Sequence, residues 1–273
     1  MNLDNLIIDG NFATILLWFA AYCFIGWIWE SSYRSIRNHK FINSGFLTGP
    51  YIPIYGFGAL GYIFIMHFTL NPIELFFIGG LLACAIEYIT SWALEQLFHA
   101  RWWDYSSATL NINGRVCLQG FIAFGAFAVI LPYVHLFVGN IIDQINPTWR
   151  IILIIIFFAA FFTDLANTVR GLIKFNKTLR RLQGEIERQT APLIEVANRN
   201  RNRFEMYVKR GQHRMKEIFR SSQVRLLRAF PNFRSVEYPE AFKRIRKLYE
   251  DSVKNMKDNQ FKPIKTQKTK RKK

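Results

Sequence analysis

Four acidic residues lie in stretches that are otherwise apolar: Glu30, Glu87, Glu95 and Asp164. A carboxylate at membrane depth costs several kcal/mol unless it is paired or hydrated. On a helix, Glu87, Ser91 and Glu95 would share one face, because every fourth residue returns to the same side. The pattern therefore predicts acids that face the interior of a helix bundle and line a path for a polar substrate.

A structural role for the same acids is the alternative. Counted at about 1.5 Å per residue, Glu87 and Asp164 come out roughly 20 Å from the outer membrane edge, whereas Glu30 and Glu95 lie near the inner edge. Acids near an edge can pair with arginine and only tie helices together; the candidates are Arg34, Arg101, Arg115 and Arg170. No basic residue lies at the depth of Glu87 or Asp164, which favours the path interpretation for these two.

Five apolar runs are long enough to hold these acids in a membrane. A helix needs about 20 residues to cross the hydrocarbon core, and the runs lie near residues 12–30, 53–70, 73–97, 117–137 and 150–170. The run IILIIIFFAAFF is apolar all round, unlike the amphipathic helices of soluble proteins. The sequence predicts an all-α, polytopic membrane protein, with a transmembrane domain over 1–171 and a helical, basic cytoplasmic tail over 172–273.

The charge is distributed unevenly along the chain. Residues 1–170 contain 7 Lys and Arg against 9 Asp and Glu, and residues 171–273 contain 29 against 10. Every other loop is basic, owing to Arg34, Arg37, Lys40, Arg101 and Arg115. By the positive-inside rule, this pattern predicts a multi-pass protein of the cell membrane, with its N-terminus outside and its C-terminus in the cytoplasm.

Two long inner loops are rich in residues that disfavour helices. The first reads NSGFLTGPYIPIYGFGALGY over 43–62, and the second reads FHARWWDYSSATLNINGRVCLQG over 98–120. Irregular backbone at membrane depth is tolerated where protein or a watery cavity satisfies its polar groups. We expect a cytoplasm-facing vestibule floored by both loops, the alternative being a tight turn that merely seats the second span. The residues of the vestibule would be Gly45, Gly49, Pro50, Pro53, Tyr55, Gly56, Trp103, Asp104, Tyr105, Asn111, Asn113, Gly114 and Arg115.

The two loops also align with each other. Placing Gly45 on Gly114 puts Tyr55 on Phe124, Gly56 on Gly125 and Ala59 on Ala128. Each loop follows a span that ends near a glutamate and precedes a span that enters from the cytoplasm. The pattern predicts a parallel repeat in which the first two spans correspond to the third and fourth.

Ion pairs are expected to hold the vestibule together. If the second loop folds back under the bundle, Arg115 should pair with Asp104 or Glu95, and Glu30 should pair with Arg34 or Arg115. Removing one partner of a partly buried pair costs about 3–5 kcal/mol. Arg150, in an outer loop, is expected to contribute almost nothing.

Three motifs of the chain resemble those of a known family. GWIWESSYRSI, NSGFLTGPYIPIYGFGAL and IEYITSWALEQLFHARWWDYSSATLNINGRVCL are similar to motifs of bacterial membrane proteins known as the type IV ABC-transporter permease family. The resemblance covers about residues 12–170 and implies a polytopic membrane fold with a transport role. Family members usually have arginine before the Gly-Phe-Leu, where this chain has Ser44, so the vestibule lacks one positive charge.

The motif content favours a transport component over an enzyme. There is no G-x-x-x-x-G-K-[ST] loop and no metal-ligand spacing among Cys and His, so we expect no metal, no cofactor and no ATP hydrolysis through that motif. One alternative is an inner-leaflet enzyme acting on a lipid or lipid-linked substrate. Its acid–base groups would be Glu95, His99 and Asp104, with Arg34 or Arg115 holding a phosphate.

The basic tail supports a different alternative, a scaffold that recruits a cytoplasmic partner. We expect tail helices over 172–230 and 237–258, separated by the breaker AFPNF and followed by KTKRKK. Such a tail attracts anionic membrane lipids. Nucleic acid is not an expected partner, because no aromatic–glycine motif for base stacking is present. The other expected partners are a separate ATPase subunit or further copies of this chain.

Overall fold

The computed structural model describes residues 12–69, 71–196, 227, 229–243, 246, 247 and 250, of which 185–196 are described as backbone only. The chain divides into two compact units. The first comprises Met1–Lys177 and Phe219–Glu237, and the second comprises Thr178–Ile218 and Tyr238–Lys273. Most of the expected tail lies outside the described residues, including 197–226 and the terminal KTKRKK.

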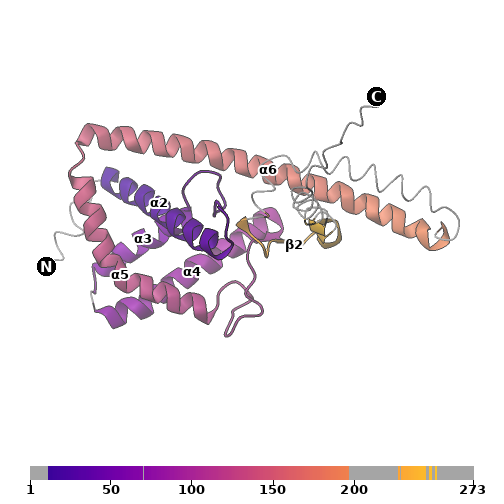
Figure 1. The fold of residues 1–273 in the computed structure, drawn as a ribbon, viewed down its shortest axis with the longest axis horizontal. Helices are drawn as coiled ribbons and strands as arrows, with labels where there is room; N and C mark the ends of the chain where they lie inside the picture. Colours follow the sequence, from indigo (N-terminus) through magenta and orange to yellow (C-terminus); the bar gives the residue numbers. More distant parts are fainter. Residues whose placement is uncertain are drawn as a thin grey trace, which may run out of the picture. The chain divides into compact units, whose positions relative to one another are not determined.

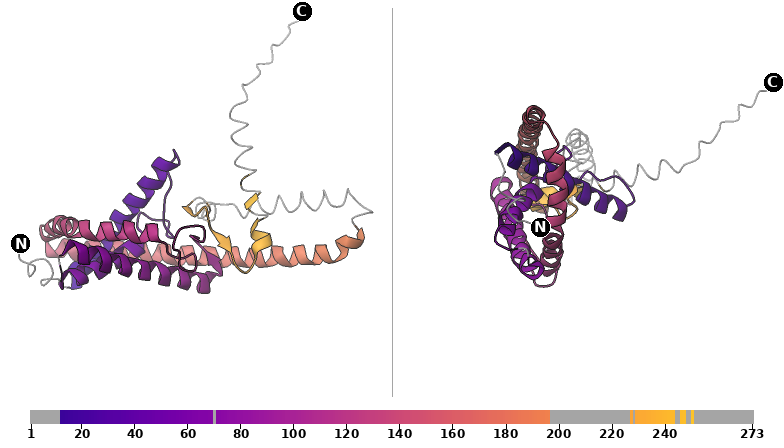
Figure 2. Two further views of the ribbon diagram at one scale, coloured as in Figure 1. Left: turned by 90° about the horizontal axis from the view of Figure 1, so that it is seen from below. Right: turned by 90° about the vertical axis from the view of Figure 1, so that its left-hand side faces the viewer.

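Helices account for almost all the regular structure, as predicted (Figure 1). Two antiparallel two-residue strands, β1 and β2, join Ala100 to Ser235 and Arg101 to Arg234. In all three views the helices α2 to α5 lie together beside the first part of α6 (Figures 1 and 2). The elements are α2 (Phe12–Arg37), α3 (Pro53–Met66), α4 (Pro72–Phe98), β1 (Ala100–Arg101), α5 (Leu118–Asp143), α6 (Pro147–Val196) and β2 (Arg234–Ser235).

Four of the five expected spans are helices long and apolar enough to cross a membrane: α2, α4, α5 and the part of α6 over Pro147–Gly184. The fifth, expected near 53–70, is the 14-residue helix α3. At about 1.5 Å per residue it reaches roughly 21 Å, less than the hydrocarbon thickness of about 30 Å. It ends at Met66 because the chain turns there and Asn71 caps the next helix.

Local sequence sets where these helices begin and end. Proline stands at the first position of α3, α4 and α6, where its missing N–H costs nothing. The Asn71 side chain accepts a hydrogen bond from the N–H of Ile73 (2.9 Å), which satisfies one free donor at the start of α4. His99 ends α4 in a left-handed conformation, a common helix stop.

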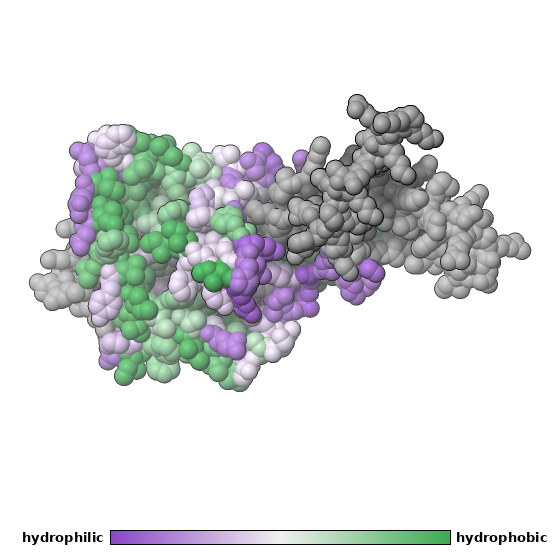
Figure 3. Space-filling view, in the orientation of Figure 1, coloured by the Kyte–Doolittle hydropathy of each residue, from purple (hydrophilic) through white to green (hydrophobic). Residues whose placement is uncertain are grey.

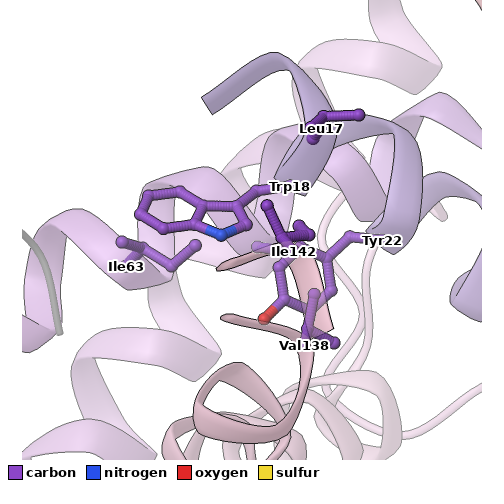
Figure 4. Close-up of a cluster of buried hydrophobic side chains, with 7 residues drawn as sticks. Leu17, Trp18, Tyr22, Ile63, Val138 and Ile142 are labelled. Atoms are coloured by element: carbon purple, nitrogen blue, oxygen red, sulfur yellow. The ribbon is translucent and has the colours of Figure 1, made fainter. Parts of the chain in front are cut away.

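Apolar side chains from four helices form the main core. Leu17, Trp18 and Tyr22 of α2 cluster with Ile63 of α3 and with Val138 and Ile142 of α5 (Figure 4), and Ile154 of α6 packs against this cluster. A second cluster joins α2, the first loop and α6 through Phe19, Cys23, Leu47, Tyr51 and Phe161. On the visible face, apolar side chains gather over the helices and hydrophilic ones lie at either end of them (Figure 3). This distribution matches helices surrounded by lipid.

The predicted repeat agrees with several backbone features. His39 and His99, just after α2 and α4, both have positive φ angles, of 50° and 49°. Gly45 and Gly114, the glycines aligned from the sequence, also have positive φ angles, of 101° and 67°. The aligned Ala59 and Ala128 are both buried, as are Gly56 and Gly125. The aligned glycines therefore share a left-handed conformation, and each loop also begins with a left-handed histidine, although His39 and His99 are not aligned with each other.

The second unit contains the last part of α6 and a short helical stretch that begins at residue 239. Within it the N–H of Ala241 donates a hydrogen bond to the Gln183 side chain (3.1 Å). Among the described residues of this unit, Leu179, Ala241 and Phe242 are buried and apolar. The expected tail helices are thus observed for the described residues only.

Close packing at Gly79 gives the first prediction. A Cβ atom at Gly79 of α4 would collide with the Tyr62 ring and with the Ala128 methyl group, and the Tyr62 hydroxyl donates to the Gly79 carbonyl (2.6 Å). Gly79→Ala should lower the free energy of unfolding by about 1–3 kcal/mol, the usual cost of overpacking. Thermal unfolding of purified protein measures it. Gly139→Ala is the control, because a Cβ at Gly139 of α5 meets nothing within 4 Å; equal melting temperatures for the two variants would contradict the packing.

Candidate functional site

The polar residues predicted from the sequence gather at one end of the helices, which we call the loop face. It consists of the first loop (38–52, between α2 and α3), the second loop (99–117, between α4 and α5) and the tail segment 229–237. All three lie in the first compact unit. The four acids predicted from the sequence have three different surroundings, because Glu30 and Glu87 belong to one cluster.

Asp164 of α6 holds the first loop. Its Oδ2 accepts hydrogen bonds from the N–H groups of Thr48 (2.8 Å) and Gly49 (2.7 Å) and from the Tyr51 hydroxyl (3.1 Å). Its Oδ1 accepts from the Thr168 hydroxyl (3.3 Å). An open pocket of about 530 Å³ lies beside this carboxylate. Asp164 therefore satisfies irregular backbone that the first loop would otherwise leave unpaired.

Burial and the neighbouring Asp164 carboxylate both raise the pKa of Tyr51. Burial is the larger effect and raises the pKa of the Tyr51 phenol, and the charge of Asp164 raises it further. The phenol therefore keeps its proton at neutral pH and serves as a donor to Asp164. Gly49 lies against the Tyr51 ring, where any side chain would collide with it. The expected loop glycine is thus required by a close approach.

Glu95 of α4 is held by two arginines from the second loop region. Its Oε2 accepts from Nε of Arg101 and from Arg115, both at 2.8 Å. Arg115 also donates to the Ser91 hydroxyl (3.1 Å) and lies over the Tyr88 ring, 5.5 Å from its centre. The predicted pair between Glu95 and Arg115 is confirmed. Because Arg115 is buried, this pair has strict geometry and little access to water.

The second loop supplies its own internal support. The amide of Asn111 bonds to the carbonyls of Ser106 (3.2 Å) and Ala108 (3.0 Å), and its oxygen accepts from the N–H of Gly114 (3.0 Å). Asn113, with a φ of 53°, donates to the hydroxyl of Tyr88 (2.8 Å). The Asn-x-Asn-Gly sequence thus forms a turn that presents the following arginine to α4.

Two further side chains stabilise the second loop, one within the loop and one toward the tail segment. Trp103 donates from its indole N–H to the carbonyl of Arg115 (2.9 Å). Asp104 accepts from the N–H of Ser106 (3.1 Å) and pairs with Arg234 of the tail segment (3.1 Å). Of its two predicted partners, Arg115 therefore pairs with Glu95. Asp104 instead pairs with Arg234 of the tail segment.

Glu87 and Glu30 belong to one polar cluster, together with Tyr55 and Tyr105. Tyr105 of the second loop donates to Oε1 of Glu87 (3.2 Å). Tyr55, near the start of α3, donates a hydrogen bond to Glu30. Arg34 lies 3.5 Å from Glu30, which confirms the other predicted pair. Glu87 is only 7% exposed, and its Oε2 has no hydrogen-bond partner.

This cluster affects the pKa of the Tyr105 phenol. Burial raises the pKa of Tyr105, and the neighbouring Glu87 carboxylate raises it further. The phenol therefore stays protonated at neutral pH and remains a donor. We call Glu30, Tyr55, Glu87 and Tyr105 the acid–tyrosine cluster. Of the acids predicted to line a path, it contains two, whereas Glu95 and Asp164 lie elsewhere with several donors each.

The tail segment is the part of the loop face that the sequence did not predict. Trp102 of the second loop is 2% exposed, and four aromatic rings lie 5.0 to 6.4 Å from it. Two of these rings, Phe230 and Phe233, come from the tail segment. The other two are Phe46 of the first loop and Phe98 of α4. The AFPNF sequence, interpreted as a helix breaker, is thus also an aromatic anchor.

The remaining residues predicted for the vestibule loops lie at a helix start, in close packing contacts or on the surface. Pro50 is exposed in the first loop, and Pro53 begins α3. Gly56 is buried against Phe19 and Cys23 of α2, where a Cβ would collide with both. Ser44, at the position where arginine was expected, is fully buried, and its N–H donates to the Ser31 hydroxyl (3.1 Å).

Within the residues that the structure describes, no group of three or more His, Cys, Asp or Glu side chains is arranged to hold a metal ion. The acid–base groups considered for an enzyme each have a charged neighbour. His99 lies 3.9 Å from Glu237, and the carboxylates of Glu95 and Asp104 have the arginine partners described above. The arrangement is that of a structural network joining loops to helices.

Comparison with known proteins agrees with this membrane architecture. The family model described as "Putative ABC-transporter type IV" matches residues 17–169. The chain belongs to this family. No curated protein and no solved structure matches it. The matched range covers α2 to α5, both loops and the first part of α6, and so includes all four predicted acids. The chain is thus a membrane protein related to ABC transporters.

One sequence prediction is wrong for Arg150. It was expected to contribute almost nothing, but its side chain donates to the carbonyls of Ile145 (2.8 Å) and Asp143 (3.0 Å). Asp143 is the last residue of α5 and Ile145 follows it, and the carbonyl groups at a helix end lack helical partners. Arg150 therefore caps this helix end, and it is unsuitable as a neutral control.

The Glu95 network gives the second prediction. Arg115→Ala should lower the free energy of unfolding by about 3–5 kcal/mol, because it leaves Glu95 without one of its two cations in a buried place. Arg37→Ala is the matched control: Arg37 is exposed near the end of α2, and a surface change of this kind stays within about 0.5 kcal/mol. Thermal unfolding of the purified proteins compares them. Similar melting temperatures for both variants would show that Arg115 only contacts lipid headgroups.

The third prediction concerns the tail segment. Ala100 and Ser235 are directly paired across β1 and β2, a spacing that suits a disulfide. The double variant Ala100→Cys with Ser235→Cys should form an intramolecular crosslink under mild oxidation, detected by mass spectrometry of peptides. Adding Trp102→Ala should slow the crosslink strongly, because the aromatic anchor is lost. The single cysteine variants are controls, and a double variant that stays reduced would contradict the docking of this segment.

Proposed function

We propose that the protein is the membrane-embedded, permease-like subunit of an ABC-type transporter, with a cytoplasm-facing vestibule at the loop face. Membership of the family supports the transport role. The observation that carries the proposal is Glu87, a carboxylate buried among membrane helices with one oxygen left without a partner. A purely structural acid would be expected to have its oxygens satisfied, because an unpaired buried polar group costs about 1–3 kcal/mol or more.

The substrate path proposed here passes the acid–tyrosine cluster. Glu30 leads into it, since its side chain is 27% exposed whereas Glu87 is buried. Glu95 and Asp164 serve a different purpose, because each already has several donors and holds a loop in place. The vestibule would therefore be floored by the loops and supported by these two acids, with Glu87 as its innermost polar group.

The proposed orientation places the loop face in the cytoplasm. Arg34, Arg37, Lys40, Arg101 and Arg115 all belong to this end of the helices, which favours the inner side of the membrane. An ATPase partner would be a separate chain, because this sequence has no phosphate-binding loop of the G-x-x-x-x-G-K-[ST] type. It would dock at the loop face, and anionic lipids would contact the basic residues around it.

Transport by a Glu87 variant tests the proposal. The complex purified from native membranes, including any ATPase subunit, is reconstituted into liposomes, and ATP-dependent accumulation of small polar solutes from a defined mixture is followed by mass spectrometry. Glu87→Gln should reduce the accumulation at least about tenfold, since a charged hydrogen bond is worth about 1.5–3 kcal/mol. The variant keeps the size of the side chain and removes only its charge.

Glu74→Gln is the matched control, because Glu74 lies exposed in the first turn of the same helix. It should transport as the wild type does. Accumulation by Glu87→Gln at the wild-type rate would end the claim that Glu87 lies on the path. A wild-type complex that contains an ATPase subunit yet accumulates nothing from mixtures of cations, anions and neutral solutes would end the transport proposal itself.

A further inference from the structure

The unpartnered oxygen of Glu87 lies in a defined place. Oε1 accepts from Tyr105 at 3.2 Å, and Oε2 has no partner although the residue is 93% removed from solvent. Gly120, near the start of α5, backs onto this oxygen; a Cβ placed there would lie 3.8 Å from it. A methyl group at that position would therefore lie in van der Waals contact with Oε2.

Apart from Arg34, the groups around Glu87 are carboxylates, phenols and thiols. They come from every element that packs there: Glu30 and Arg34 of α2, Tyr55 of α3, Cys84 of α4, Tyr105 of the second loop and Cys117 before α5. Arg34, the cation among them, lies 3.5 Å from Glu30 and is its ion-pair partner. The Arg34 charge thus balances one of the two carboxylates, and the carboxylate of Glu87 has a neutral phenol only.

This count of charges determines the kind of ligand. Two carboxylates and one guanidinium leave one negative charge, so a single positive charge balances the cluster. An anion would meet two carboxylates and is disfavoured. A divalent metal ion usually takes several carboxylate or imidazole ligands, and no group of three such side chains exists in the part of the chain that is described. Carboxylate, phenol and backbone oxygens suit a proton or an alkali-metal ion.

We propose that the acid–tyrosine cluster binds one monovalent cation, either a proton or an alkali-metal ion, with Glu87 as the charged ligand and Tyr105 as its neighbour. Glu30 would be the point of entry, because its side chain is partly exposed. This site goes beyond the proposed transport function and does not depend on it. An ion can bind here in a protein that transports nothing.

Thermal unfolding of the full-length protein in detergent tests the site without any transport assay. The probes are NaCl and KCl against choline chloride at constant ionic strength and pH 8, followed by choline chloride alone from pH 8 to pH 5. An alkali-metal ligand should raise the melting temperature by about 3–6 °C for each tenfold increase in its concentration above half-saturation. A proton ligand should raise the melting temperature toward pH 5 with no response to Na⁺ or K⁺.

Variants separate Glu87 from the other titrating groups. Glu87→Gln should lose the response to the salt or the pH, whichever the wild type shows, and Glu74→Gln should keep it. Tyr105→Phe keeps both carboxylates and serves if Glu87→Gln does not fold; it should raise the half-saturating concentration about tenfold, or shift the midpoint of the pH response, because one hydrogen bond is lost. The proposal fails if the wild type responds to neither probe. It also fails if the Glu87→Gln response, or the Tyr105→Phe response when Glu87→Gln does not fold, equals that of the wild type.

Discussion

A carboxylate inside an apolar helix has to find its donors within the protein, because hydrocarbon offers none. Here the donors come mainly from the loops. The first loop gives two backbone N–H groups and a phenol to Asp164 of α6, and the second loop region gives two guanidinium groups to Glu95 of α4. Acid and loop are thus mutually dependent, since the irregular loop backbone also needs acceptors. The shape of the loop face follows from these pairings.

The same requirement explains why the glycines, prolines and asparagines are where they are. At Gly49 the backbone approaches the Tyr51 ring and delivers its N–H to Asp164, which a side chain would prevent. Gly114 has a φ of 67° and presents its N–H to Asn111, so that Arg115 continues toward Glu95. The residues that disfavour helices therefore do not weaken the membrane part of the chain. They let two loops reach the charges that the helices contain.

Much of this could be predicted from the sequence, and the rest fails for definite reasons. The apolar runs and the pairing of Arg115 with Glu95 rest on side-chain types and spacing, which a sequence displays. The donors to Asp164 are largely backbone N–H groups of Thr48 and Gly49, and these carry no side-chain signal. For this reason the sequence does not show that Asp164 also holds the first loop, whereas its place on a path stays a prediction. The length of α3 was overestimated because apolar residues continue past the point where its backbone turns.

The contact between Trp102 and the tail segment could not have been found from spacing, since it joins residues more than a hundred positions apart. Its only sequence signal is two phenylalanines around a proline in a basic tail. Such a pattern is typical of a helix break as well as of an anchor. The capping role of Arg150 was missed for a similar reason, because its acceptors are backbone carbonyls of α5 and the residues after it.

Glu87 differs from the other acids because one of its carboxylate oxygens has no hydrogen-bond partner. Its neighbours Tyr55 and Tyr105 connect it to both loops. Tyr105 belongs to the second loop, and its own N–H donates to the carbonyl of Gly114 (2.8 Å), next to Arg115. Tyr55 lies near the start of α3, where the first loop ends. A positive charge bound at Glu87 would therefore change the forces on both loops through two phenols. By thermodynamic reciprocity, a partner that shifts either loop would change the affinity of Glu87 for that charge by the same factor. A site built in this way connects the interior of the bundle to the loop face with two side chains and no moving helix.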